Sequence, residues 1–273
     1  MTSRSSTSRI VGTEILDGLA ADDPAARRSR RDLKRVHRAM GTRSIIRRAL
    51  RDTPASNPGK RPLRVLELGA GDGSLMLGVA RELAPTWPRV ELTLLDRQAL
   101  VSLEIIESYA RLGWTVVEHV VDALEWAVDT TDSFPRGNEL NAVGQNQRWT
   151  DTTDTFPRGN ELARWDLIVT NLFLHHFEGS QLAILLNSIT ARSNGFFACE
   201  PRRTWLSLAG SHLAVLIGAG AVTREDAVLS VHAGFRDKEL TGLWPADPDE
   251  WRVHEYSAGL FSHCFHAERV GRP

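Results

Sequence analysis

The stretch Arg64-Val65-Leu66-Glu67-Leu68-Gly69-Ala70-Gly71-Asp72-Gly73-Ser74 decides the fold of this chain. A short apolar run is followed by a turn with three alternating glycines, and then by a stretch that is compatible with a helix. Glycine lets a backbone turn tightly and approach a ligand closely, because no Cβ blocks positive φ. Two acids, Glu67 and Asp72, flank or occupy the turn. Because a helix N-terminus with free amide groups attracts anions, these acids predict a ligand that is cationic or rich in hydroxyls and amines.

The size and composition are those of an ordinary globular protein. The chain has 273 residues and 30.3 kDa, with 42% hydrophobic and 25% charged residues, which suits one generous α/β domain, alone or with a small appendage. The formal net charge of −1 conceals an uneven distribution, because residues 1–60 hold 14 Lys and Arg against 6 Asp and Glu. We interpret this as a solvated basic helix rather than as a nucleic-acid arm.

Residues 61–273 alternate between strand-like and helix-like segments. Such alternation predicts parallel strands in a doubly wound sheet. The predicted strands are Leu63–Leu68, Val90–Leu95, Thr115–Val121, Asp166–Asn171 and Gly195–Cys199. The chain ends differently, because Trp251–Ser257 and Leu260–Arg269 are joined at Ala258-Gly259 and predict an antiparallel hairpin.

The N-terminal residues 1–60 are predicted to be a disordered tail followed by a basic helical cap. Helices are expected over Ile10–Leu19 and over Asp23–Arg51, with Asp23-Pro24 as a start signal and Gly41 as a break. The segment from Trp205 to Val222 is the most apolar one, and we expect a helix that is buried or that lines a pocket. Thr223 with Asp226 resembles a capping box at the start of the next helix.

A tandem duplication interrupts the sheet domain. Residues 129–140 recur as residues 151–162 with one difference, Ser133 against Thr155. Two polar copies are too few for a repeat fold, so the segment 127–164 is interpreted as a duplicated loop insertion on the surface.

The glycine turn resembles the first motif of the class I S-adenosylmethionine-dependent methyltransferases, which reads E/D-x-G-x-G-x-G. Residues 67–73 read Glu-Leu-Gly-Ala-Gly-Asp-Gly, whereas a dinucleotide fingerprint places its third glycine one residue later. The resemblance implies a Rossmann-like seven-stranded sheet in the order 3-2-1-4-5-7-6. It also implies S-adenosylmethionine as the cofactor, bound by the motif residues, which are Glu67, Gly69, Ala70, Gly71, Asp72 and Gly73. A glycine-rich turn without a ligand remains an alternative.

Acids follow the next two predicted strands. Asp96 lies 23 residues after Gly73, close to the spacing at which an acid meets ribose hydroxyls. We include its neighbour Arg97 among the cofactor-binding candidates. In the resembling family an acid at the end of the third strand binds the adenine amino group and the next backbone amide meets a ring nitrogen; these roles would fall to Asp122 and Ala123.

The end of the fourth predicted strand would face the methyl donor and acceptor. Asn171 is a cofactor-binding candidate there, and it is followed by Leu172 rather than by the Pro-Pro-Tyr/Phe of enzymes that methylate nucleic-acid bases. The candidates for a general base are three histidines, because imidazole has an ordinary pKa near 6.5; they are His175, His176 and His212. A structural role for each histidine remains open.

No metal requirement is expected, since the nine histidines and two cysteines show none of the familiar ligand spacings. Cys199 and Cys264 suit a reducing compartment. Together with the absence of an apolar secretory signal they predict a cytoplasmic protein without membrane insertion. The expected partner is a small-molecule acceptor and not a nucleic acid, and the oligomeric state is left open.

The sequence therefore predicts a class I S-adenosylmethionine-dependent methyltransferase. Its acceptor would be small and largely apolar, such as a phenol, a quinol or a polyketide-like molecule, because residues 200–235 are rich in apolar side chains. Two alternatives stay open: an NAD(P)-dependent oxidoreductase with a Rossmann fold, and a nucleoside-binding module without catalysis.

Overall fold

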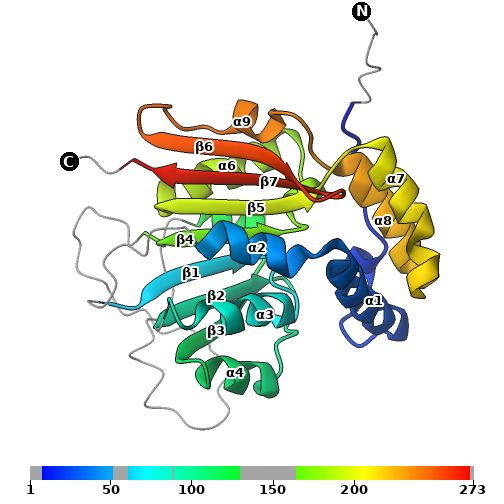
Figure 1. Ribbon diagram of the computed structural model, residues 1–273, viewed down its shortest axis with the longest axis horizontal. Helices are drawn as coiled ribbons and strands as arrows, with labels where there is room; N and C mark the ends of the chain where they lie inside the picture. Colours follow the sequence, from blue (N-terminus) through cyan, green and yellow to red (C-terminus); the bar gives the residue numbers. More distant parts are fainter. Residues whose placement is uncertain (1–7, 52–60, 88, 130–163, 271–273) are drawn as a thin grey trace, which may run out of the picture.

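The structure is a computed structural model that describes residues 8–51, 61–87, 89–129 and 164–270. One seven-stranded sheet runs through it in the order β3-β2-β1-β4-β5-β7-β6, with helices on both faces (Figure 1). This order is the one that the resemblance implies, and the doubly wound fold class is confirmed.

The strands lie close to where the sequence places them. Five strands are parallel, and the hairpin at the C-terminal end of the chain pairs antiparallel to β5 and within itself. Leu94 and Leu95 of the second strand are buried, as are Leu66 and Leu68 of the first. The strand bounds are β1 Leu63–Leu68, β2 Val90–Asp96, β3 Trp114–Val120, β4 Leu167–Asn171, β5 Gly195–Pro201, β6 Trp251–Ala258 and β7 Ser262–Arg269.

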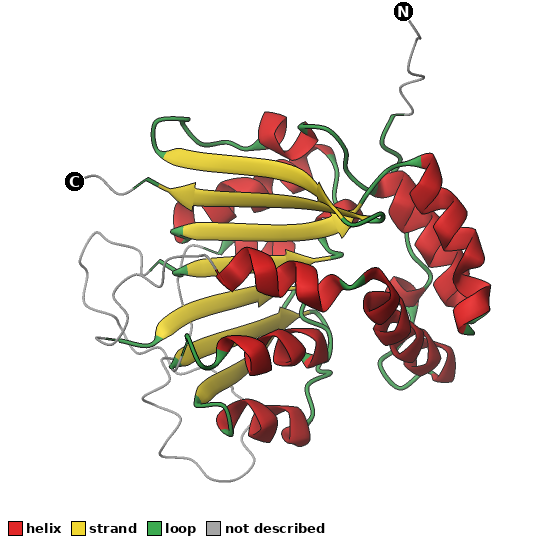
Figure 2. Ribbon diagram, viewed as in Figure 1, coloured by secondary structure: helices red, strands yellow, loops and turns green. Residues whose placement is uncertain are grey.

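Each face of the sheet buries its own hydrophobic cluster. Helices α2 (Thr42–Arg51), α3 (Ser74–Leu83) and α4 (Leu103–Ala110) cover one face, with Ile46 and Leu50 packed beside Met76. On the other face lie α5 (Ala123–Val128), α6 (Gly179–Arg192) and α9 (Glu239–Leu243). Figure 2 shows the sheet in yellow between these red helices. Helix α4 begins at Leu103, because Ser102 caps it and residues 98–102 form a loop.

The N-terminal helices form as expected, but the segment before them does not. Asp23 caps α1 (Pro24–Met40), and Gly41 separates it from α2 with a φ of 68°. The predicted helix over Ile10–Leu19 is wrong: apart from one short 3-10 turn, Leu16–Gly18, this segment has no regular secondary structure. Its amide groups are bound elsewhere, because Ile15 and Leu16 donate to Asp226 at 2.7 and 3.0 Å.

Two expectations about residues 205–233 are also wrong. Helix α7 (Trp205–His212) and the 3-10 helix η4 (Leu213–Ile217) expose apolar side chains instead of burying them; Trp205 is 80% exposed and Leu216 is 77% exposed. Helix α8 (Ala221–Ala233) begins before Thr223, so no capping box starts there. Thr223 donates instead to Ser29, and Asp226 binds the N-terminal segment. Both side chains serve tertiary contacts that the sequence pattern cannot distinguish from a cap.

The duplicated segment falls almost wholly outside the described residues, apart from its ends at 127–129 and at residue 164. Among the helices that the structure does describe, none combines the length and the apolar character that crossing a bilayer requires.

Candidate functional site

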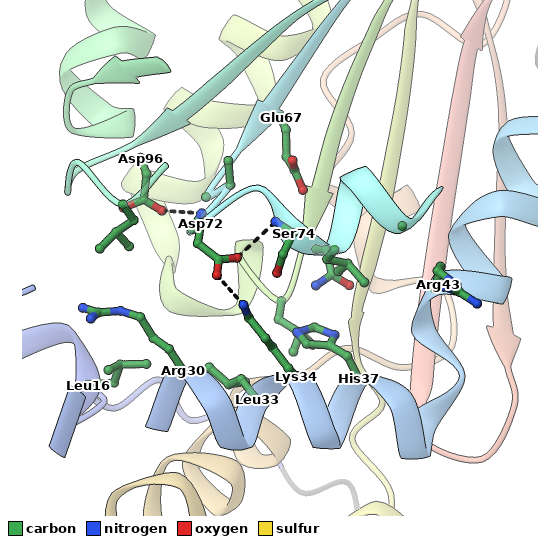
Figure 3. Close-up of a pocket in the computed structure, with 18 of the residues that line it drawn as sticks. Leu16, Arg30, Leu33, Lys34, His37, Arg43, Glu67, Asp72, Ser74 and Asp96 are labelled. Atoms are coloured by element: carbon green, nitrogen blue, oxygen red, sulfur yellow. Dashed lines mark hydrogen bonds and ion pairs between the residues drawn. The ribbon is translucent and has the colours of Figure 1, made fainter. Parts of the chain in front are cut away.

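A cavity of about 670 Å³ opens at the carboxyl ends of β1, β2 and β4. The glycine turn and α3 form its floor, α1 covers it, and the N-terminal segment around Glu14 and Asp17 closes one side. Figure 3 shows the side chains of α1 directed at the turn between β1 and α3. Ligands of open α/β sheets bind at this edge, so the position agrees with the sequence prediction.

The three glycines of the turn all have left-handed backbone conformations. Gly69, Gly71 and Gly73 have φ values of 71°, 57° and 71°, a region that costs other residues energy. At Gly69 space is also lacking, because a Cβ would lie 2.3 Å from the ring of Phe173. The Gly71 amide donates to the Asp96 carboxylate at 2.9 Å. The end of β2 therefore holds the turn in its open shape.

Glu67 is the unusual ionisable group of this site. Its side chain lines the cavity, is 3% exposed, and one carboxylate oxygen is buried without a hydrogen-bond partner. Burial, together with the nearby charges of Asp96 and Asp72, raises the pKa of Glu67 to about 8. A buried carboxyl group without a partner is costly in a folded protein, so this position suits a ligand that brings a donor or a positive charge.

Asp72 is already occupied, in contrast to Glu67. Lys34 of α1 lies 2.6 Å from its carboxylate, and the Ser74 amide donates to it at 3.0 Å. Burial would raise the pKa of Asp72, but these donors outweigh burial and lower it. The ion pair ties helix α1 to the glycine turn across the cavity (Figure 3).

His37 of α1 is a site residue that the sequence reasoning missed. It lines the cavity, and its buried Nδ1 has no hydrogen-bond partner. Burial lowers the pKa of His37 to about 4, while Asp72 acts in the opposite direction, so the imidazole is neutral at neutral pH. In the sequence His37 lies in a run of basic residues, which we interpreted as a solvated helix. The apolar stripe of that helix was the available signal, since His37 follows Val36 and lies four residues after Leu33.

His175 is fully engaged at the other end of the cavity. Its Nδ1 lies 2.9 Å from Glu200 of β5, and its Nε2 lies 3.3 Å from Glu14 of the N-terminal segment. Burial by itself would lower the pKa of His175, but the two carboxylates outweigh burial and raise it to about 9. Glu200 also accepts from the amides of Phe173 and Leu174. A histidine in this state is protonated at neutral pH, which does not suit a general base.

The other two predicted catalytic histidines differ in position. His176 lines the cavity, and its Nδ1 lies 3.2 Å from Asp17, which also pairs with the predicted cofactor residue Arg97 at 2.9 Å. His212 is exposed at the end of α7 and is not among the described residues that line the cavity. The structure thus brings His175 and His176 to the site and leaves His212 outside it.

Most of the predicted cofactor residues converge on the cavity. Those that line it are Glu67, Gly69, Ala70, Gly71, Asp72, Asp96, Arg97 and Asn171. Asn171 has a buried side-chain oxygen without a partner, so it too can accept a hydrogen bond from a ligand. Gly73 supports the turn from below, where its carbonyl accepts from Tyr109 at 2.8 Å.

Asp122 and Ala123 stand apart from this group. Neither is among the described residues that line the cavity. Asp122 caps α5 by accepting from the Leu124 amide at 2.7 Å, and Ala123 is 7% exposed. Their predicted contacts with adenine stay a prediction, and the apparent strand-end acid has a structural role as a helix cap.

The residues present fit a nucleoside with a cationic tail. Asp96 lies beside the turn with carboxylate oxygens that have capacity beyond their bonds to Gly71 and Gln98. The unpartnered oxygens of Glu67 and Asn171 lie in the same cavity. A pyrophosphate would instead meet a buried acid at the turn, which disfavours a dinucleotide.

Comparison with known proteins places the fold. No family model matches the chain, and no curated protein matches it in sequence. Among solved structures, that of the plantazolicin methyltransferase BpumL in complex with SAH has a TM-score of 0.53 at 14% identity, covering 91% of this chain and 92% of that one. The plantazolicin methyltransferase BamL in complex with a triazolic desmethylPZN analog and SAH has a TM-score of 0.53 at 12% identity, covering 93% and 92%. With its sheet order and its glycine turn, the chain has the fold of the class I S-adenosylmethionine-dependent methyltransferases.

Proposed function

We propose that this protein is an S-adenosylmethionine-dependent methyltransferase that acts on a small molecule. The observation that carries the proposal is the buried, unpartnered carboxyl group of Glu67 beside the glycine turn, in a cavity at the carboxyl ends of the strands. The similar structures support it, because those of BpumL and BamL are complexes with SAH, the product that remains after methyl transfer.

The cofactor would be held mainly by the β1–α3 turn. Asp96 would accept from the ribose hydroxyls, the glycine backbone would pass beneath the tail, and Glu67 would face the positive charges of that tail. S-adenosylmethionine supplies an activated methyl group on a sulfonium. The protein then aligns the acceptor and excludes water, which alone accounts for large rate effects; α1 and the N-terminal segment cover the cavity for that purpose.

The acceptor is proposed to be small, of the phenol, quinol or polyketide-like class. The sequence predicts an apolar acceptor, and the cavity lining indicates that this acceptor also has a polar group. Of residues 200–235 only Ser230 lines the cavity, while the apolar contacts come from Leu16, Leu33, Leu75, Leu100 and Leu172. Charged side chains of α1 and α2 share the wall with them, among them Arg30, Arg38 and Arg43. An acceptor with an apolar body and a polar oxygen matches this mixture.

His37 is proposed as the group that accepts the proton from an acceptor hydroxyl. It lines the cavity and is neutral at neutral pH, and its Nδ1 has no hydrogen-bond partner. Positioned bases of this kind contribute about 100-fold or more to a rate. His37→Gln is therefore expected to lower kcat by about 100-fold at pH 7.5 with little change in the affinity for the cofactor, whereas His212→Gln, outside the cavity, should leave kcat unchanged.

Calorimetry on the tag-free full chain tests the proposal. We expect S-adenosylmethionine to bind with a stoichiometry of one, and NAD⁺ and NADP⁺ not to bind. Phenols and quinols incubated with the cofactor and the protein should yield SAH, measured by mass spectrometry. Binding of a nicotinamide cofactor without S-adenosylmethionine would instead favour the oxidoreductase. Cofactor binding without SAH formation from any acceptor would favour a binding module.

A further inference from the structure

A second feature of the cavity lies where the N-terminal segment meets the end of β4. Two adjacent histidines and a carboxylate from a distant part of the sequence meet there: His175, His176 and Glu14. One potential ligand atom from each lies within 4.8 Å of the others. Because 161 residues separate Glu14 from His175, no spacing in the sequence reveals this group, and our expectation of no metal rested on spacing alone.

The separations are close to those of a metal centre. Two ligands at the usual zinc distances of about 2.0 to 2.2 Å and at tetrahedral angles lie roughly 3.4 Å apart. Glu14 Oε1 and His175 Nε2 are 3.3 Å apart. The largest separation in the group exceeds the tetrahedral value, so metal binding would require the ring of His176, whose side chain is 22% exposed, to shift toward the other two ligands.

The surroundings of the two rings are those that metal-binding histidines commonly have. Such a histidine usually gives its other ring nitrogen to a carboxylate, which fixes the ring and raises its basicity. His175 Nδ1 lies 2.9 Å from the buried Glu200, and His176 Nδ1 lies 3.2 Å from Asp17. Each ring is thus held by a carboxylate. The cations nearby are Arg9, which donates to the carbonyl of His175 at 3.1 Å, and Arg97, which pairs with Asp17.

We propose that Glu14, His175 and His176 form a binding site for a divalent transition metal of the Zn²⁺ type, with Glu200 and Asp17 as positioning residues. Two imidazoles and one carboxylate suit zinc and disfavour magnesium, which prefers oxygen ligands. All three ligands line the cavity, so a remaining coordination position faces its interior.

The competing occupant of the site is a proton on His175. In that case the imidazolium links Glu14 and Glu200 as an ion-paired clasp. Metal ligation requires the neutral ring, so Zn²⁺ and this proton exclude each other, and binding of Zn²⁺ at pH 7.5 releases protons. The experiment needs neither cofactor nor acceptor, so its result is independent of the proposed methyltransferase activity.

The test measures Zn²⁺, Co²⁺ and Mg²⁺ binding to the tag-free full chain after dialysis against a chelator. We expect one Zn²⁺ per chain by calorimetry, with proton release, no comparable binding of Mg²⁺, and visible absorption bands of the Co²⁺ form that mark nitrogen and oxygen ligands. His176→Ala and Glu14→Gln should weaken Zn²⁺ binding by more than about 100-fold. Asp17→Asn, which keeps all three ligands, should weaken it by about 10-fold to 100-fold.

His212→Ala is the matched control, because it removes an exposed histidine outside the group, and it should leave Zn²⁺ affinity unchanged. Circular dichroism of each metal-free variant checks folding. The proposal is overturned if the wild-type chain gives no stoichiometric Zn²⁺ binding, or if His176→Ala and Glu14→Gln, both folded, bind Zn²⁺ as tightly as His212→Ala does. The Co²⁺ spectrum of the wild-type chain decides the question should either variant not fold.

Discussion

The two walls of the cavity differ in whether their ionisable side chains have hydrogen-bond partners. At the wall formed by β1 and α1, Glu67 is buried and His37 is half-buried, and each has a buried polar atom without a partner. At the wall formed by β4, β5 and the N-terminal segment, Glu200 and His175 are buried but are bonded on every side that the structure describes. Paired groups stabilise the fold, whereas unpaired ones destabilise it until a ligand or a proton supplies a partner. The paired residues therefore stabilise the walls of the cavity, whereas the unpaired ones are available to bind a ligand.

The largest expected effect compares two buried glutamates. Glu200→Gln should lower the free energy of unfolding at pH 7 by about 3–5 kcal/mol, because it breaks a buried ion pair and leaves His175 without that carboxylate. Glu67→Gln should instead raise it, by at most about 3 kcal/mol, because Glu67 has no partner to lose and its pKa of about 8 shows that ionisation in the folded chain is unfavourable. Urea unfolding of both variants measures the two values. Equal losses would remove the distinction between the walls.

The next largest effect is expected in the pH dependence of stability, to which the unpaired groups His37 and Glu67 both contribute. The pKa of His37 is about 4 in the folded chain and near 6.5 when unfolded, so the unfolded chain takes up a proton first as the pH falls. Stability is then lost between pH 6.5 and about 4, by at most about 3 kcal/mol. Glu67 has the opposite sign: its pKa of about 8 lies above the unfolded value, so its contribution is lost as the pH rises from about 4.5 to 8.

His37→Gln and Glu67→Gln isolate these two contributions. Unfolding free energies at pH 4.5, 6.0 and 8.0 are compared with those of the wild-type chain. His37→Gln should flatten the acid side of the profile and Glu67→Gln the alkaline side. A wild-type profile shared by both variants would mean that neither group is held away from its ordinary pKa.

Binding of S-adenosylmethionine should ionise the unpaired carboxyl group of Glu67. When S-adenosylmethionine brings positive charge to Glu67, the ionised form is favoured and up to one proton is released at pH 7. Glu67→Gln should abolish this release and weaken binding by about 10-fold or more, since hydrogen bonds to charged groups contribute about 1.5–3 kcal/mol. Calorimetry in buffers of different ionisation enthalpy measures both quantities. Glu107→Gln, an exposed glutamate of α4, is the control.

The smallest expected effect concerns the ion pair between α1 and the glycine turn. Lys34→Met removes the pair with Asp72, whose side chains are 49% and 32% exposed, so the free energy of unfolding should fall by less than about 1 kcal/mol. Thermal unfolding at low and high salt checks this, because a screened surface pair loses its effect in salt. A loss of several kcal/mol would show that α1 is held to the turn mainly by this contact.

The sequence by itself determined the sheet and one half of the site. Apolar runs followed by Gly69, Gly71 and Gly73 are local signals, because strand burial and positive φ depend on the residues in place. Asp96 follows for the same reason, since the end of a neighbouring parallel strand must lie beside the turn. These predictions hold in the structure within a residue or two at the strands.

Only the tertiary structure decided the other half. In the sequence His37 is one more residue of a basic helix, and only the position of α1 over the cavity makes it a lining residue. Asp226 has the spacing of a helix cap, but in the structure its carboxylate accepts from the amides of Ile15 and Leu16. Glu14 and His175 meet across 161 residues of chain. Pairing between distant segments depends on how the chain packs in space, and periodicity and spacing carry no information about it. The sequence therefore indicated which strand ends line the cavity, and the packing of the N-terminal segment decided which other groups face it.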